Sequence, residues 1–162
     1  MRRILVVAAL AVALAACSSG KDAASQQALK EKADRYEIEQ IEVTWHKASS
    51  TKDVDLMMTL WAPNATATLG GQTYTGKDQI RNFFVTKAGP FQPQNHWVSE
   101  TPAYKIRITV DGDKGTLYFE CHYVDAATKK VVAVVSADQD VARINGTWLI
   151  TKLVSATPEL GY

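Results

Sequence analysis

The first third of the chain carries apolar residues at helical spacing. A helix expected over residues 31–49 has four apolar residues at steps of three, four and three, which place them on one face: Ile38, Ile41, Trp45 and Ala48. The polar residues between them are expected to stay in water: Glu37, Glu39, Gln40 and Glu42. This helix should therefore pack one face against the rest of the protein.

Two shorter helices are expected to follow. Asp53 can cap the start of the second helix, and Pro63 ends it. Its apolar face would carry four residues: Val54, Met57, Met58 and Trp61. The third helix opens at Thr75-Gly76-Lys77-Asp78, which has the form of a capping box, and stops at Gly89-Pro90. Its apolar side would carry Ile80, Phe83 and Phe84.

After residue 93 the hydrophobic period changes from helical to extended. The pattern predicts one long or bulged strand over residues 94–110 and further strands over residues 115–125, 131–144 and 147–157, after short extended pieces at 65–69 and 72–75. Asn145-Gly146 is typical of a tight hairpin turn. Alternation in the second of these long strands puts four residues on one face: Leu117, Phe119, Cys121 and Tyr123. Helices followed by a strand meander indicate an α+β domain, with the helices on one face of an antiparallel sheet.

The start of the chain has the features of a secretory signal over residues 1–16. Arg2 and Arg3 precede an apolar run that is too short to span a bilayer, and small residues follow it. The string Leu14-Ala15-Ala16-Cys17 resembles the lipobox of bacterial lipoproteins, which implies cleavage before Cys17 and lipidation of that residue. Ordinary cleavage after Ala15 is the alternative, since Ala13-Leu14-Ala15 also has a suitable form. Residues 18–30 are small and polar, and their composition predicts a flexible tether between Cys17 and a domain over residues 31–162.

Net charge and cysteine content limit which partners the chain is expected to bind. Removal of Arg2 and Arg3 from the 18 basic residues leaves 16 against 17 acidic residues, so a near-neutral mature chain has no field to recruit nucleic acid. Attachment to a membrane would depend on the lipid, since each buried methylene contributes about 0.8 kcal/mol.

With Cys17 lipidated, Cys121 has no partner and is expected to be a buried small hydrophobic residue. The three histidines are too far apart for a metal-ligand motif, and we expect neither a metal nor a cofactor.

Several local strings, in order, resemble the NTF2-like superfamily and its SnoaL-like branch. They are Trp61-Ala62-Pro63-Asn64-Ala65, Tyr74-Thr75-Gly76-Lys77-Asp78-Gln79-Ile80, Asn95-His96-Trp97-Val98-Ser99, Val110-Asp111-Gly112-Asp113 and Arg143-Ile144-Asn145-Gly146-Thr147-Trp148. The resemblance extends over about residues 34–154. It implies three N-terminal helices packed on a strongly curved antiparallel sheet that encloses a cone-shaped pocket. It does not fix the function, because that fold carries isomerases, dehydratases, cyclases and non-catalytic binding modules.

The resemblance also supplies candidate residues for the pocket. His96 stands where scytalone dehydratase-like members keep a cavity histidine, which makes it the candidate general acid or base. Residues of several kinds are candidates for the wall of the cone: Tyr36, Trp45, Trp61, Tyr74, Cys121 and Gln139. Tyr36 and Tyr74 would provide hydroxyl groups near the mouth, and the aromatic rings would favour an apolar ligand.

Two departures from the related enzymes weigh against catalysis. Ser50 and Gln139 occupy positions where such enzymes often carry an inward acidic residue. Glu120 could replace them, but alternation places it with Tyr118 and His122 on the convex face, which is open to a homodimer partner. The sequence thus predicts an envelope lipoprotein, on the outer membrane rather than the inner membrane, that binds a small apolar ligand or a protein partner without turnover. The alternative is a SnoaL-like isomerase, dehydratase or cyclase that uses His96.

Overall fold

The computed structural model describes residues 8–156, with side chains described for residues 22–155, and divides into two units, Met1–Asp34 and Arg35–Tyr162. The charged start of the expected signal and the side chain of Cys17 lie outside this description, so lipidation stays a prediction. Within residues 8–156, no helix combines the length and apolar character that a membrane span requires.

Helix α1 spans Ala8–Thr51 and is much longer than the helix expected over residues 31–49. It includes residues 18–30, for which the composition predicts a coil. Alanine, glutamine and lysine are frequent between residues 21 and 32, and all are good helix formers. The structure therefore places residues 18–30 in α1 and not in a coil. The predicted apolar face is confirmed, because Ile38, Ile41, Trp45 and Ala48 are all buried.

The other helices are α2 (Val54–Met58), α3 (Lys77–Thr86) and the short 3-10 helix η1 (Gly89–Phe91). Asp53 caps α2 as predicted, and its Oδ1 accepts a hydrogen bond from the backbone N–H of Leu56 at 2.8 Å. The expected capping box at α3 is wrong. The N-cap is Gly76, which provides no side-chain hydrogen bond. Instead, the side-chain Oε1 of Gln79 accepts a hydrogen bond from the backbone N–H of Thr75 at 3.0 Å.

Within residues 8–156, seven strands form one sheet in the order β2-β1-β7-β6-β5-β3, with β4 also paired to β5. Their bounds are β1 Trp61–Leu69, β2 Gln72–Thr75, β3 Trp97–Ser99, β4 Lys105–Asp111, β5 Lys114–Asp125, β6 Val131–Ile144 and β7 Thr147–Ala156. All pairs are antiparallel except β1 with β7. The single strand expected over residues 94–110 is two strands, β3 and β4, separated by residues 100–104. The hairpin at Asn145-Gly146 is confirmed, with positive φ at both residues.

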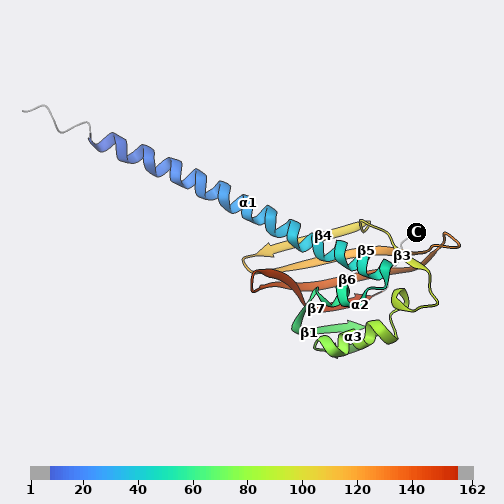
Figure 1. The fold of residues 1–162 in the computed structure, drawn as a ribbon. Coiled ribbons are helices and arrows are strands. Elements are labelled where there is room, and N and C mark those ends of the chain that lie inside the picture. Colours follow the sequence, from blue (N-terminus) through green and yellow to red (C-terminus); the bar gives the residue numbers. More distant parts are fainter. Residues whose placement is uncertain (1–7, 157–162) are drawn as a thin grey trace, which may run out of the picture. The chain divides into compact units, whose positions relative to one another are not determined.

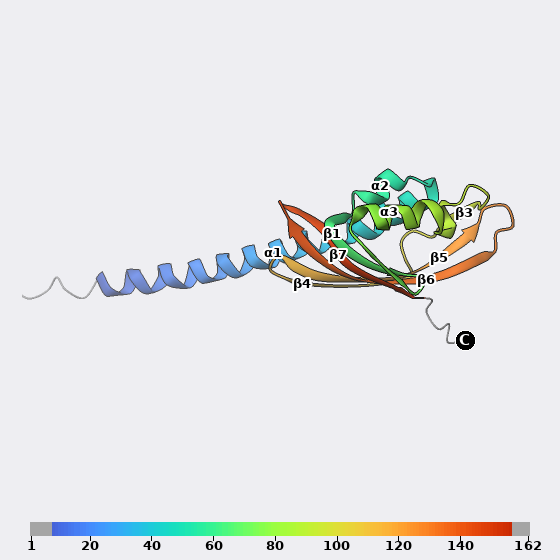
Figure 2. The same cartoon turned by 90° about the horizontal axis from the view of Figure 1, so that it is seen from below.

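Within the unit Arg35–Tyr162, α2 and α3 lie on one face of a curved sheet (Figures 1 and 2). The β5–β6 and β6–β7 ladders each contain a register shift, and such irregularities bend strands. Alternation on β5 is confirmed, since Leu117, Phe119, Cys121 and Tyr123 are all buried under the helices. The predicted α+β fold, with helices packed on a curved, unclosed sheet, is confirmed.

Candidate functional site

A cavity of about 210 Å³ lies between the helices and the inner face of the sheet. Most of its wall is apolar, and aromatic rings from five elements of the fold contribute to it: Trp45, Phe83, Phe84, Phe91, Trp97, Phe119 and Tyr123. The wall residues placed by β6 are small or branched, namely Ala133, Val135 and Ala137. A concave pocket of this composition is typical of a site for a small apolar molecule.

Local periodicity explains how distant segments meet at this cavity. Phe119, Cys121 and Tyr123 are at steps of two on β5, so all three side chains face inward. Trp45 and Ser49 are four residues apart on α1, so they share one helix face over the same strand. The ring of Trp45 packs edge-on against Phe119, with 5.9 Å between the ring centroids.

Two hydroxyl groups form the main polar feature of the wall. The Tyr123 hydroxyl donates to the Ser49 hydroxyl oxygen over 3.2 Å, joining β5 to α1. Burial raises the pKa of Tyr123 to about 12, and burial likewise raises the pKa of the Cys121 thiol to about 12. Both groups therefore keep their protons at neutral pH. Ser155 of β7 also lines the cavity.

The wall carries no ionisable group suited to acid–base work at neutral pH. Among its residues in the described part of the chain there is no aspartate, glutamate, histidine, lysine or arginine. General acid–base catalysis needs a group with a pKa near the operating pH within hydrogen-bond reach of the substrate. The described lining therefore supplies no such group.

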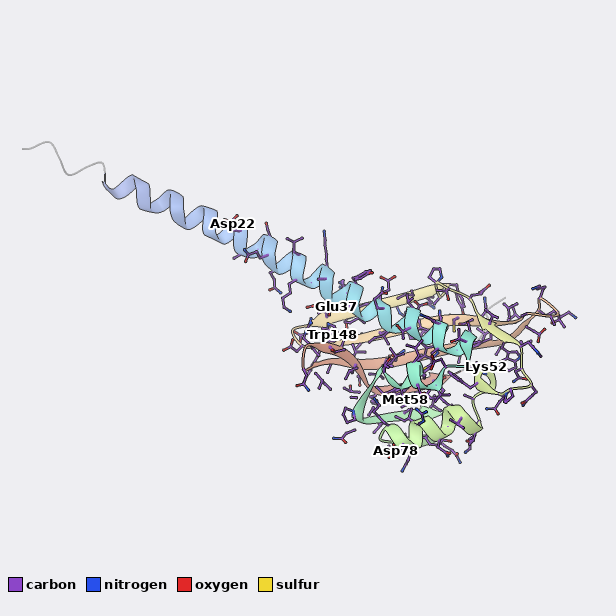
Figure 3. The ribbon with its side chains drawn as sticks, in the orientation of Figure 1. Asp22, Glu37, Lys52, Met58, Asp78 and Trp148 are labelled. Atoms are coloured by element: carbon purple, nitrogen blue, oxygen red, sulfur yellow. The ribbon has the colours of Figure 1, made fainter. Side chains whose placement is uncertain are left out.

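One side of the cavity is formed by η1 and the residues after it, and Lys52 fixes this segment. Lys52 follows α1 with a φ of 58°, and its Nζ donates to the backbone carbonyl oxygens of Gln92 and Asn95, the second at 2.5 Å. Figure 3 shows Lys52 at the end of α1. Asn95 in turn donates from Nδ2 to the carbonyl oxygen of Gly89 at 2.9 Å. Lys52 and Asn95 together therefore hold the wall that contains Phe91 and Trp97.

The structure does not bring the candidate catalytic residue His96 to the cavity. Its side chain is exposed, and its backbone carbonyl accepts the N–H of Ala126 at 2.8 Å. Tyr36 is 63 % exposed, because it lies away from the buried face that holds Ile38 and Ile41. Tyr74 packs its ring on Phe83, but its hydroxyl donates to Gln72 at 3.0 Å, and it is not part of the cavity wall.

The remaining candidates lie closer to the cavity. Trp45 and Cys121 line it, and Cys121 is a buried free thiol as predicted. Trp61 is buried beside Trp45, with 6.1 Å between ring centroids, but it is not part of the wall. Gln139 is fully buried on the inner face of β6, as the alternation predicted, and neither atom of its amide has a hydrogen-bond partner among the described residues.

Sequence reasoning missed a buried polar pair on α1. Glu42, expected in water, is fully buried, as is His46 one turn later. The Nδ1 of His46 lies 2.9 Å from Oε1 of Glu42, and the His46 ring packs edge-on against Phe119 at 5.4 Å between centroids. The spacing of four residues was a signal for this pair, since it places both side chains on one helix face.

Glu120 lies on the outer face of the sheet, as its alternation predicted, and is held by three donors. Its carboxylate accepts hydrogen bonds from the Tyr104 hydroxyl and the Lys105 ammonium, both at 2.7 Å, and from the Tyr118 hydroxyl. Lys105 first, and then the two phenols, lower the pKa of Glu120 to about 2. Glu120 is therefore a structural anion on the outer face and does not replace an acid in the cavity.

No cluster of three metal-ligating side chains occurs among the described residues.

This architecture, helices over the inner face of a curved sheet with an apolar cavity between them, defines an NTF2-like domain. The family model of the SnoaL-like domain matches residues 30–154, and the chain belongs to that family. No curated protein matches the chain.

Solved structures with low sequence identity share the fold. An NTF2-like protein of unknown function from Pseudomonas putida KT2440 has a TM-score of 0.69 at 16% identity, over 78% of this chain and 88% of that one. An NTF2-like protein with a cystatin-like fold from Novosphingobium aromaticivorans has a TM-score of 0.66 at 16% identity, over 86% and 89%. A type 2 hexachlorocyclohexane dehydrochlorinase has a TM-score of 0.65 at 17% identity, over 83% and 89%. At these identities the likeness establishes the fold alone.

Proposed function

We propose that the domain binds a small apolar ring compound in its cavity without turning it over. The observation that carries this proposal is the cavity wall itself, which combines about 210 Å³ of space with aromatic rings from α1, α3 and β5 and with no acid or imidazole among the described lining. Burial of apolar ligand surface supplies the binding free energy, at roughly 25 cal/mol per Å². The dehydrochlorinase neighbour indicates only that the fold also accommodates enzymes.

Titration calorimetry with tetralin, an uncharged bicyclic hydrocarbon, tests binding. Val135→Phe fills the cavity, because Val135 is part of its wall, whereas Val134→Phe adds the same ring one residue away on the opposite face of β6. We expect saturable 1:1 binding that Val135→Phe abolishes and Val134→Phe preserves. Absence of saturable binding in the unaltered chain, or equal loss in both variants, would remove the cavity as the binding site.

The alternative function, a SnoaL-like isomerase, dehydratase or cyclase that uses His96, makes a different prediction. Such an enzyme needs a base that can remove a proton next to a carbonyl group, and His96 is exposed and not part of the wall. 1-Tetralone in heavy water reports this chemistry, because a base would exchange its C2 protons for deuterium over many turnovers. We expect no acceleration by the chain. Exchange that His96→Ala abolishes would establish the enzymatic function instead.

We further propose that the domain works in the bacterial envelope, anchored by lipid on Cys17. The lipobox-like string Leu14-Ala15-Ala16-Cys17 and the near-neutral charge of the mature chain support this, because the chain lacks the positive field that would otherwise attract an anionic membrane. Ser18 after the cysteine resembles lipoproteins that continue to the outer membrane. The helix through residues 18–30 would then serve as the spacer next to the lipid.

Metabolic labelling with palmitate tests the anchor. The chain has two cysteines, so Cys121→Ala is a matched control for Cys17→Ser. We expect label and membrane association in the unaltered chain and in the Cys121→Ala variant, and neither in the Cys17→Ser variant. A mature protein that begins at Ala16 and carries no label would support ordinary cleavage after Ala15, and would end the lipid proposal.

A further inference from the structure

The hydroxyl pair of Ser49 and Tyr123 is the main polar feature of a mostly apolar wall. Ser49 comes from α1 and Tyr123 from β5, and both residues are buried, with exposed fractions of 1 % and 4 %. Their oxygens are 3.2 Å apart, and both residues line the cavity. A buried polar group in such a pocket fixes the orientation of a ligand, since an unmatched polar atom on the ligand would lose its hydrogen bonds to water.

Hydrogen-bond capacity defines what this pair can recognise. Two hydroxyl groups carry two protons, and the bond from Tyr123 to Ser49 uses one of them. The second proton, on Ser49 in this arrangement, has no acceptor among the described residues and can be donated to a ligand. Both hydroxyl groups are neutral at pH 7, because burial raises the pKa of Tyr123 to about 12 and a serine hydroxyl does not ionise near neutral pH. The pair is therefore a neutral donor for a neutral acceptor.

The rest of the wall excludes charged ligands. No cationic side chain in the described lining could stabilise an anion, and no carboxylate could stabilise a cation. Desolvating an unpaired charge costs far more than one hydrogen bond returns. The other polar side-chain groups of the described wall are the Cys121 thiol, which is only a weak donor, the Ser155 hydroxyl of β7, and the indole N–H groups of Trp45 and Trp97, which are single donors.

We propose that the ligand class is an uncharged ring compound with a single hydrogen-bond acceptor, such as a ketone or ether oxygen, which the Ser49–Tyr123 pair binds. This inference rests on the proposed binding function and names the ligand chemistry of the same cavity. The aromatic walls hold the ring system, and the hydroxyl pair sets its orientation. A ligand with the same rings and no acceptor would bind through the walls alone.

Tetralin and 1-tetralone provide the test, because they share a ring skeleton and differ in one carbonyl oxygen. Calorimetry measures both ligands with the full chain and with the double variant Ser49→Ala/Tyr123→Phe. Both substitutions are made together, because either hydroxyl alone retains a proton to donate. The double variant removes both hydroxyl groups that the pair offers to a ketone, so we expect the affinity for 1-tetralone to fall about tenfold while the affinity for tetralin stays within about twofold.

The outcomes separate this inference from the binding function. If neither compound binds the full chain, the cavity proposal fails and this inference fails with it. If both compounds bind but the double variant weakens both equally, or leaves the affinity for 1-tetralone unchanged, the cavity binds rings and the hydroxyl pair does not recognise the acceptor.

A circular dichroism melt accompanies each titration, and Ser49→Ala with Tyr123 intact serves as a milder variant should the double variant unfold. In that variant the Tyr123 proton is released from Ser49, and we expect 1-tetralone to retain most of its affinity.

Discussion

The Glu42 carboxylate accepts a hydrogen bond from the backbone N–H of Ala103 at 2.7 Å, and both residues are buried. The two are 61 residues apart in sequence, so the bond fixes the segment between β3 and β4 onto α1. On the outer face, the Tyr104 hydroxyl donates to Glu120 at 2.7 Å. Adjacent residues of one loop are therefore held from opposite faces of the sheet.

Glu42→Ala should lower the free energy of unfolding by about 2–4 kcal/mol. The substitution leaves the Ala103 N–H without an acceptor in the interior, and an unsatisfied buried donor is a recognised source of large destabilisation. Urea unfolding measures the effect. Glu42→Gln should cost less, since its amide oxygen can still accept from Ala103.

Lys47→Ala is the matched control for Glu42→Ala, because it truncates an exposed side chain on the same helix. It should change the free energy of unfolding by no more than about 0.5 kcal/mol. Equal losses for Glu42→Ala and Lys47→Ala would mean that the buried hydrogen bond of Glu42 adds nothing to stability, since alanine is the best helix former and neither loss could come from helix propensity.

Glu120 should give the protein an acid-sensitive stability. Its pKa is about 2 in the folded protein, below the ordinary value of 4.5, so the unfolded chain takes up a proton first as the pH falls. The stabilisation is therefore complete above about pH 4.5 and is lost progressively between pH 4.5 and 2. Thermal melts across pH 2–6 should show a steeper fall for the unaltered chain than for Glu120→Gln. Parallel curves in this range would show that Glu120 is not the group responsible.

The parts of the fold that could be predicted from sequence depend on local rules. Alternation alone placed Cys121 on the inner face of β5 and Glu120 on the outer face, because successive side chains of a strand point to opposite faces. The Asp53 cap and the Asn145-Gly146 turn are likewise encoded within a few residues.

The parts that could not be predicted depend on distant partners. Nothing near Glu42 indicates that an N–H from residue 103 will satisfy it, so its polarity favoured an exposed position. The family resemblance predicts a cavity position for His96, but His96 lies in a loop where its side chain is exposed. The Ser49–Tyr123 contact joins residues 74 positions apart, and each residue alone looks like ordinary helix or strand.

Lys52 should be a positioning residue for the cavity wall. Its positive φ suits glycine, so Lys52→Gly should relieve backbone strain of about 1–2 kcal/mol, whereas Lys52→Met keeps that strain. Both variants lose the hydrogen bonds to the carbonyl groups of Gln92 and Asn95. We expect the glycine variant to be the more stable of the two in urea, and both variants to release tetralin several times faster than the unaltered chain. Unchanged release in both would show that the wall keeps its position without Lys52.

Gly89 should be needed for the packing of Trp97 against the cavity wall. A Cβ at position 89 would lie 2.4 Å from Cζ3 of Trp97, and Trp97 itself lines the cavity, so Gly89→Ala must displace the indole. We expect it to destabilise the fold by about 1–3 kcal/mol and to weaken tetralin binding.

Gly112→Ala is the control, because a Cβ there meets nothing within 4 Å and the cost is backbone strain alone, at a φ of +59°. It should lower stability by about 1–2 kcal/mol and leave tetralin affinity unchanged. If Gly89→Ala also left that affinity unchanged, the indole would not be part of the binding surface.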